Sequence, residues 1–317
     1  MPMLDMPLRE LERYRGAPRP DDMDAYWDEA LKEVTDTSYV LEPSDFQVPG
    51  YECATLFFEG TGGARVGGKF IRSLRGGKLP AIAVFHGYRG NSGDFFHLLP
   101  YAAAGMVVFA LDARGQMGVS EDTFRSRGNT MQGLIVRGLE EYDPKRLYFR
   151  DVFLDTVQGV RILMEMPFVD ASRVGVAGGS QGGALSTACA ALEPRVKAAA
   201  ITYPFLSDFR RVWEMDMCKL AYEELSYFIR WRDPLHEHME QMFHALDYID
   251  VSHLAPRIRA RTHFFLTLQD EMCPPSTQFA VYNNAPQPKT RDLYYNHGHE
   301  DLPLMADRAL MFLQRTL

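Results

Sequence analysis

The sequence lacks most of the features that mark secreted, membrane-embedded and nucleic-acid-binding proteins. Only four of its 317 residues are cysteine and none forms a C-x-x-C pair, which disfavours a metal site and predicts reduced, buried thiols. No apolar run approaches the ~20 residues that cross a bilayer, and the charged N-terminal stretch contains no apolar leader. Runs of like charge are absent, and a net charge of -8 disfavours nucleic acid. We expect a cytoplasmic protein that needs no metal or cofactor and binds neither membrane nor nucleic acid.

The apolar segments predict one α/β domain over residues 1–317. With 46% hydrophobic residues, the chain has ample material for a core. Several runs are apolar at every position, which is typical of strands that helices cover on both faces. Strands are expected at residues 52–58, 64–71, 81–85, 106–111, 173–177, 196–203, 262–268 and 291–295. Helical spacing at 95–104, 148–166 and near the C-terminus completes the alternation. This order predicts a mostly parallel central sheet with helices on both faces.

Three segments lie outside this alternation. Residues 1–50 are charged and rich in proline, and we expect them to form an N-terminal extension with a helix after Pro20-Asp21-Asp22. Residues 116–146 are polar and glycine-containing, and a loop of this length is usually functional or part of an interface. Residues 207–250 are helical and rich in aromatic residues and methionine. They predict a helical insert that either packs on the core or caps the sheet edge near an active site.

A serine framed by glycines follows the strand at 173–177. In the run Gly178-Gly179-Ser180-Gln181-Gly182-Gly183, glycines lie two positions before and two positions after Ser180, and a small-residue helix begins directly afterwards. A strand, a sharp turn and a helix hold a serine hydroxyl at a sheet edge in a strained backbone conformation. The glycines let neighbouring chain pass closely. A tight glycine turn with an incidental serine would look the same, so the other strand ends must decide.

Polar side chains follow the predicted strands at the edge where active groups of parallel sheets gather. In chain order the strands end at Tyr88, Arg114, Ser180, Asp208, Asp270 and His299. Serine, then acid, then histidine is the order found in α/β-hydrolases. A serine hydroxyl needs a histidine base, and a carboxylate behind the imidazole fixes its tautomer. The negative oxygen of the tetrahedral intermediate needs two backbone N–H groups, for which Gln181 and Tyr88 are the candidates.

The acid has one competitor. Asp270 ends its strand directly, and the Cys273-Pro274-Pro275 run that follows stiffens the turn, so we favour it over Asp208. Asp112 comes too early in the chain order, and we interpret it as a structural partner of Arg114.

The histidine base is open between two positions. His297 and His299 are two residues apart, and spacing alone does not separate them. His236, His238 and His244 lie in the helical insert, where a His-x-His pair raises the possibility of a metal site. No further ligand motif accompanies them, so we interpret these three as surface or core histidines.

Several separate stretches resemble one known family. Its three signatures are matched by Arg114-Gly115-Gln116, by the run from Gly178 to Gly183 and by His299-Glu300. This is the acetyl xylan esterase and cephalosporin C deacetylase family, carbohydrate esterase family 7 of the α/β-hydrolase superfamily. The similarity continues at residues 6–8, 24–27, 148–150, 203–206 and 270–283, so it covers essentially the whole chain.

The resemblance implies an α/β-hydrolase fold and a serine esterase that removes acetyl groups from small esters. Acetylated xylo-oligosaccharides and cephalosporin C are the substrates it implies. It assigns the nucleophile to Ser180, the acid to Asp270, the base to His299, and the oxyanion-hole amides to Tyr88 and Gln181.

The resemblance also gives roles to residues around the reacting groups. It implies that Arg114 and Gln116 are structural and tie together the loops around the site. It further implies that residues 116–146 are an insertion packed between the subunits of a homo-hexamer, whose active sites face an inner cavity.

Two other functions compete with this one. A peptidase or lactone hydrolase on the same scaffold would favour peptide amides over acetyl esters. A catalytically dead hydrolase-like protein would serve as a binding or assembly module. The three triad residue types and the oxyanion loop are all present in the sequence, which argues against the last possibility.

Overall fold

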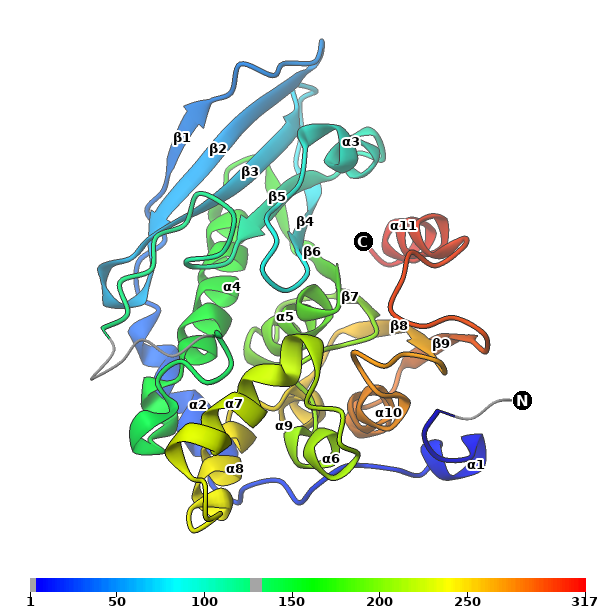
Figure 1. The fold of residues 1–317 in the computed structure, drawn as a ribbon. Coiled ribbons are helices and arrows are strands. Elements are labelled where there is room, and N and C mark those ends of the chain that lie inside the picture. Colours follow the sequence, from blue (N-terminus) through cyan, green and yellow to red (C-terminus); the bar gives the residue numbers. More distant parts are fainter. Residues whose placement is uncertain (1–3, 126–132) are drawn as a thin grey trace.

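The computed structural model describes residues 4–125 and 133–317, and within them nine strands form one sheet (Figure 1). The strands are β1 (Val40–Pro43), β2 (Tyr51–Glu59), β3 (Arg65–Ser73), β4 (Leu79–Phe85), β5 (Val107–Asp112), β6 (Val169–Gly179), β7 (Ala198–Thr202), β8 (Arg261–Thr267) and β9 (Lys289–Tyr294). Their order across the sheet is β1-β2-β3-β5-β4-β6-β7-β8-β9. The six strands from β5 to β9 in this order run parallel, whereas β1, β2 and β3 pair antiparallel at one side.

Helices cover both faces of the sheet. The α-helices are α1 (Leu8–Leu11), α2 (Met23–Ala30), α3 (Phe95–Ala103), α4 (Tyr148–Glu165), α5 (Gln181–Leu192), α6 (Phe209–Glu214), α7 (Glu223–Arg232), α8 (Met239–Asp247), α9 (Val251–Leu254), α10 (Pro275–Asn284) and α11 (Met305–Thr316). Short 3-10 turns are η1 (Leu31–Glu33), η2 (Thr61–Gly63), η3 (Leu139–Glu141), η4 (Pro144–Arg146), η5 (Leu220–Tyr222) and η6 (Ala255–Arg257). α3 and α11 lie on one face, and α4, α5 and α10 lie on the other (Figure 1).

The apolar runs seen in the sequence explain this layering. Successive side chains of a strand point to opposite faces. In β5, Val107 and Phe109 join the core under α4 and α5, while Val108 and Ala110 join the core under α3 and α11. Every residue of β5 and of β7 is buried. The predicted mostly parallel sheet with helices on both faces, the α/β-hydrolase arrangement, is thereby confirmed.

The N-terminal extension lies against the helical insert. The predicted helix after Pro20-Asp21-Asp22 is α2, whose Trp27 is fully buried and donates from Nε1 to the Tyr248 carbonyl at 3.0 Å. The predicted helices of residues 207–250 are α6, α7 and α8. β1 was not predicted, because this edge strand is largely exposed and carries no apolar run. Of the insertion at 116–146, residues 126–132 lie outside the described part.

Two expectations drawn from composition concern the cysteines and the length of the apolar helices. All four cysteines are buried and unpaired, as predicted. In the described part of the chain, no helix is both long enough and apolar enough to cross a bilayer.

Candidate active site

Ser180 occupies the sharp turn between β6 and α5. Its φ of 58° and ψ of -120° are a conformation that residues with a side chain rarely adopt. The turn forms because glycines allow close approach of backbone segments. A Cβ atom on Gly182 would lie 2.0 Å from the carbonyl oxygen of Phe85, and one on Gly178 would lie 2.6 Å from the Gly182 carbonyl. Since Phe85 is the last residue of β4, the ends of β4 and β6 and the start of α5 meet at Ser180.

An acid–base pair comes from the two strand ends beyond β7. His299, after β9, and Asp270, after β8, are joined by a contact of 2.9 Å between Nδ1 and Oδ2. Asp270 is fully buried, and its Oδ1 accepts hydrogen bonds from the backbone amides of Met272 and Cys273, each at 2.8 Å. The contact with Oδ2 places the Nδ1 proton of His299 toward Asp270, which leaves Nε2 as the basic nitrogen.

The competing candidates lie elsewhere. His297 packs its ring edge-on against Tyr294, with the ring centroids 5.6 Å apart. Asp208 caps α6, and its Oδ2 accepts a hydrogen bond of 2.7 Å from the hydroxyl of Tyr14 in the N-terminal extension. The structure therefore brings His299, rather than His297, onto Asp270, and it uses Asp208 to hold the extension.

Two glutamines join the halves of the candidate oxyanion hole. Nε2 of Gln116 donates to Oε1 of Gln181 at 2.8 Å. Oε1 of Gln116 accepts from the backbone N–H of Arg89 at 2.8 Å, and Arg89 has a left-handed φ of 56°. Gln181 begins α5 and Arg89 directly follows Tyr88, so Gln116 holds both candidate amide donors in one hydrogen-bonded unit.

His86 closes the same unit from the end of β4. Its Nε2 accepts from the backbone N–H of Ala113 at 3.0 Å, which places its proton on Nδ1, 2.7 Å from the Gly87 carbonyl oxygen. Burial lowers the pKa of His86, which keeps the ring neutral. Neutral His86 thus ties the loop after β4 to the loop after β5.

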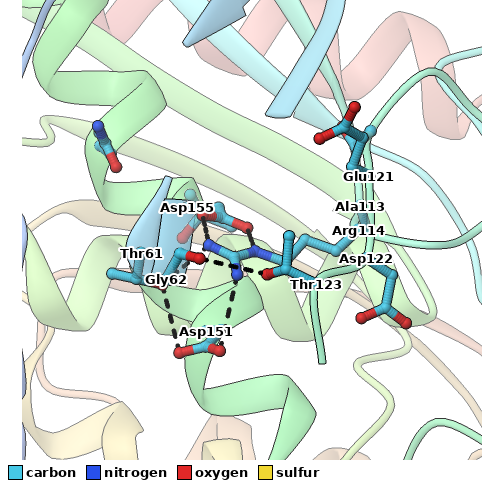
Figure 2. A network of polar contacts seen from close by, with 12 residues as sticks. Thr61, Gly62, Ala113, Arg114, Glu121, Asp122, Thr123, Asp151 and Asp155 are labelled. Atoms are coloured by element: carbon cyan, nitrogen blue, oxygen red, sulfur yellow. Dashed lines mark hydrogen bonds and ion pairs between the residues drawn. The ribbon is translucent and has the colours of Figure 1, made fainter. Parts of the chain in front are cut away.

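Arg114 anchors the loop after β5 to α4 (Figure 2). Its guanidinium group is buried and pairs with Asp155 of α4 through Nε and through Nη2, the second contact measuring 2.7 Å. Nη2 also donates to the Thr61 hydroxyl at 2.8 Å, and Asp151 lies 3.6 Å from Nη1. The Arg114 carbonyl accepts a hydrogen bond from the hydroxyl of Tyr148, at the start of α4.

The predicted pairing of Asp112 with Arg114 is wrong. Asp112 accepts hydrogen bonds from the backbone amides of Ser92 at 2.5 Å and Val119 at 3.1 Å. The chain reverses at Gly115, whose φ is +58°, and this turn directs Arg114 toward α4. Asp112 therefore holds two loops by their backbone, and the arginine finds its partner on a helix.

Ser180 and His299 open onto one pocket of about 450 Å³. Its lining residues are Gly87, Tyr88, Gly179, Ser180, Tyr203, Ala221, Met272 and His299. A larger groove of about 730 Å³ runs between α11 and the starts of β8 and β9, at the other end of these strands. The smaller pocket is the candidate site, because only it contains the serine and the histidine.

Three residues of the pocket were not singled out from the sequence. The ring of Tyr203 packs 4.6 Å from that of His299, and burial raises the pKa of Tyr203 to about 12, so its phenol stays neutral. Ala221 reaches the pocket from η5 of the helical insert, and Met272 from the Asp270 turn. In the sequence, Tyr203 is only an aromatic residue at a strand end and Ala221 only a small residue in a helical insert, and neither signal marks a pocket wall.

Possible metal ligands gather in two groups among the described residues. They are Asp270 with Cys273 and His299, and Asp247 with Asp250 and His253. In the second group both ring nitrogens of His253 face backbone carbonyl oxygens, those of Asp247 and Ala17, each at 3.1 Å. In the first group the thiol of Cys273 contacts the Ser180 hydroxyl, and burial raises the pKa of this thiol well above its usual range. The predicted surface or core histidines His236, His238 and His244 are exposed.

Known proteins resemble this chain over nearly its whole length. The family model for acetyl xylan esterase matches residues 1–316. Acetyl xylan esterase 1 from Thermoanaerobacterium sp. JW/SL YS485 is 47% identical, with a TM-score of 0.96 over 99% of both chains. An acetyl xylan esterase from Paenibacillus sp. R4 is 35% identical, with a TM-score of 0.93 over 98% of this chain and 100% of the other.

A more distant relative is an acetyl esterase, Axe7A, from Xylanibacter ruminicola. It is 25% identical over 278 residues, which are 85% of this chain and 61% of that protein. The chain thus spans about three fifths of the length of this curated relative. Given a family match over nearly all residues and two solved relatives above 30% identity, the chain belongs to the acetyl xylan esterase family, a family of carboxylic ester hydrolases with the α/β-hydrolase fold.

Proposed function

We propose that this protein is a serine esterase that removes acetyl groups from small esters, with acetylated xylo-oligosaccharides and cephalosporin C as substrates. The observation that carries the proposal is the Asp270–His299 pair, which shares one pocket with Ser180 in its strained turn. Both solved relatives are acetyl xylan esterases, which supports acetylated xylo-oligosaccharides as substrates.

In the acylation step, Oγ of Ser180 attacks the ester carbonyl while Nε2 of His299 takes its proton. The C–O bond to the alcohol then breaks, and His299 returns the proton to the leaving oxygen, which leaves acetyl-Ser180. Asp270 stabilises the imidazolium through its contact with Nδ1, and two backbone hydrogen bonds hold its carboxylate in place. Water then attacks acetyl-Ser180 with His299 as its base, which releases acetate.

The negative oxygen of both tetrahedral intermediates would be held by the backbone amides of Gln181 and Tyr88. Gln181 is the first residue of α5, so its N–H belongs to the unpaired amides at a helix N-terminus. A single donor of this kind contributes roughly 10²–10³ in rate. Around them, Gln116 and Arg114 have a structural role, because their contacts join the loops and do not reach the pocket lining.

Hydrolysis of a chromogenic acetyl ester tests the proposal. Ser180→Ala should lower kcat at least about 10³-fold, because the remaining site can only bind and polarise the ester. His299→Ala should be comparably damaging. His297→Ala is the matched control, since His297 lies two residues away and packs on Tyr294.

Three outcomes would refute the assignment. Turnover that survives in Ser180→Ala would show that Ser180 is not the nucleophile. Loss of activity in His297→Ala with retention in His299→Ala would show that His297, and not His299, is the base. Cleavage of peptide amides or lactones without acetyl ester turnover would favour the alternative hydrolases. Wild-type protein that turns over none of these substrates would favour a binding module.

We further propose that the chain forms a homo-hexamer through the insertion at 116–146 and works in the cytoplasm. The four unpaired, buried cysteines fit a reducing compartment. Mass in solution measures the assembly directly, and a monomer would exclude it.

A further inference from the structure

Glu224, on α7 of the helical insert, points its carboxylate into the core and not into solvent. The residue is only 5% exposed. Its Oε1 accepts a hydrogen bond from the hydroxyl of Tyr88. Its Oε2 accepts from the backbone amides of Ile135 at 2.6 Å and Val136 at 3.2 Å, and the adjacent amide of Leu134 donates to the Tyr88 hydroxyl at 3.0 Å. One carboxylate thus joins the loop after β4, the insertion at 116–146 and the helical insert.

All the hydrogen bonds of this carboxylate point toward it. The Tyr88 hydroxyl accepts from the backbone N–H of Leu134 and donates its own proton to Glu224. The other partners of the carboxylate are also N–H donors. Both oxygens of Glu224 therefore serve as acceptors, which is what an ionised carboxylate provides and a carboxamide or a protonated carboxyl does not.

The insertion is shaped to admit this carboxylate. A Cβ atom on Gly133 would lie 2.2 Å from Oε2 of Glu224, and Gly133 has a φ of +114°. The backbone of residues 133–136 can wrap around Glu224 only because position 133 has no side chain. The contact therefore depends both on the carboxylate of Glu224 and on the glycine at position 133.

We propose that Glu224 is a positioning residue for the esterase reaction: through the Tyr88 hydroxyl it holds the Tyr88 backbone amide at the oxyanion position. This inference rests on the proposed function. Tyr88 lines the pocket with Ser180, whereas Glu224 does not, so Glu224 acts through Tyr88 and never touches the substrate. Ala221, which also lines the pocket, lies three residues before Glu224, so the same carboxylate fixes the helix that follows this pocket wall.

Protonation of Glu224 should release Tyr88. Burial raises the pKa of Glu224 to about 7, against the opposing effects of its hydrogen-bond donors and of the Arg89 guanidinium. The ionisable groups beside it are Tyr88 and Arg89 from the loop, and Glu223 and Tyr227 from its own helix, while residues 134–136 contribute backbone amides. As the pH falls through about 7, the carboxylate of Glu224 becomes protonated although three hydrogen-bond donors already face it. Its hydrogen bond with the Tyr88 hydroxyl therefore weakens.

The test compares Glu224→Gln with Glu223→Gln, its exposed neighbour on α7. On a chromogenic acetyl ester at about pH 8.5, Glu224→Gln should lower kcat about tenfold with KM changed less than about twofold, because the variant misplaces an amide that acts on the transition state. The deficit should shrink to about twofold near pH 5.5, where wild-type Glu224 is itself protonated. Glu223→Gln should match the wild type throughout.

Tyr88→Phe provides a second measurement that keeps the ring and the backbone amide. It should show the same loss of kcat. The double variant with Glu224→Gln should lose no more kcat than either single variant, since both substitutions break the same hydrogen bond between Tyr88 and Glu224. If Glu224→Gln does not fold, Tyr88→Phe with the same pH-dependent deficit still supports the proposal.

Two results would overturn the inference. One is wild-type kcat in Glu224→Gln, with or without a lower melting temperature. The other is a deficit that stays constant across pH. Either result in a protein whose wild type hydrolyses acetyl esters leaves the proposed function intact, whereas a wild type without that activity removes the proposed function first.

Discussion

Gly182→Ala probes the geometry of the turn that carries Ser180. A methyl group at this position would lie 2.0 Å from the Phe85 carbonyl oxygen and 2.7 Å from the Phe85 carbonyl carbon. Real Cβ atoms stay at least 3.0 Å from such atoms, so the start of α5 must retreat from β4 by at least about 1 Å. Both partners are backbone, and no flexible side chain can move aside.

We expect Gly182→Ala to lower kcat more than it lowers the free energy of unfolding. Overpacking costs about 1–3 kcal/mol, and the higher helix propensity of alanine offsets about 1 kcal/mol of it. A misplacement of about 1 Å at a reacting group lowers the rate by about 10²-fold. We therefore expect kcat on an acetyl ester to fall about 10²-fold, while urea denaturation shows a loss of at most about 2 kcal/mol.

Gly76→Ala is the matched control for this substitution. A Cβ atom there meets nothing within 4 Å, and Gly76 does not have a left-handed φ. Both properties should leave kcat and the denaturation midpoint as in the wild type. Wild-type kcat in Gly182→Ala would refute the argument, because it would mean that α5 can shift without moving the Ser180 hydroxyl.

The other predictions concern the pocket wall, the glutamine bridge and a buried histidine. Ala221→Val should lower the butyryl-to-acetyl rate ratio at least about tenfold, since the added methyl groups reduce the space in the pocket that holds Ser180; rates on acetyl, propionyl and butyryl esters measure this. Gln116→Leu should lower kcat about tenfold and the free energy of unfolding by about 1–2 kcal/mol, as it removes the link between Arg89 and Gln181. Burial lowers the pKa of His253, but Asp250 and other acceptors outweigh it and the net pKa is raised. Its contribution to stability is therefore fully present below about pH 6.5 and lost as the pH rises through the higher folded-state pKa, so urea denaturation of His253→Gln should differ most from the wild type at low pH.

The central sheet could be predicted because its strands are buried on both faces. A strand such as β5 must be apolar at every position, and a continuous apolar run is easy to see in a sequence. β1 could not be predicted, because an exposed edge strand needs no such run. The turn at Ser180 could be predicted for a different reason. A Cβ atom at Gly182 would lie about 2 Å from a backbone atom, so the turn requires glycines, and their spacing around Ser180 can be recognised in the sequence.

Partners that meet only in the folded protein could not be predicted. Asp112 and Arg114 are two residues apart and opposite in charge, yet each contacts a different part of the chain. Arg114 pairs instead with Asp155, 41 positions away on α4. Glu224 follows Glu223 directly, and two successive glutamates are expected on a solvent-exposed helix face, although Glu224 is buried. Sequence proximity and charge say little about such contacts, because burial is decided by tertiary packing.

Two of the three segments outside the alternation, the N-terminal extension and the helical insert, reach the candidate site through buried carboxylates. Asp5, in the N-terminal extension, accepts a hydrogen bond of 2.7 Å from the backbone N–H of Ser276, at the start of α10. α10 directly follows the turn that holds Asp270, and Arg211 of the insert pairs with the same Asp5 at 2.8 Å. Glu224, in the helical insert, likewise holds Tyr88 beside the candidate oxyanion hole. The strand ends thus supply the reacting groups, while the chain outside the sheet fixes the loops that carry them, and substitutions in these outer segments should alter rate before they alter the fold.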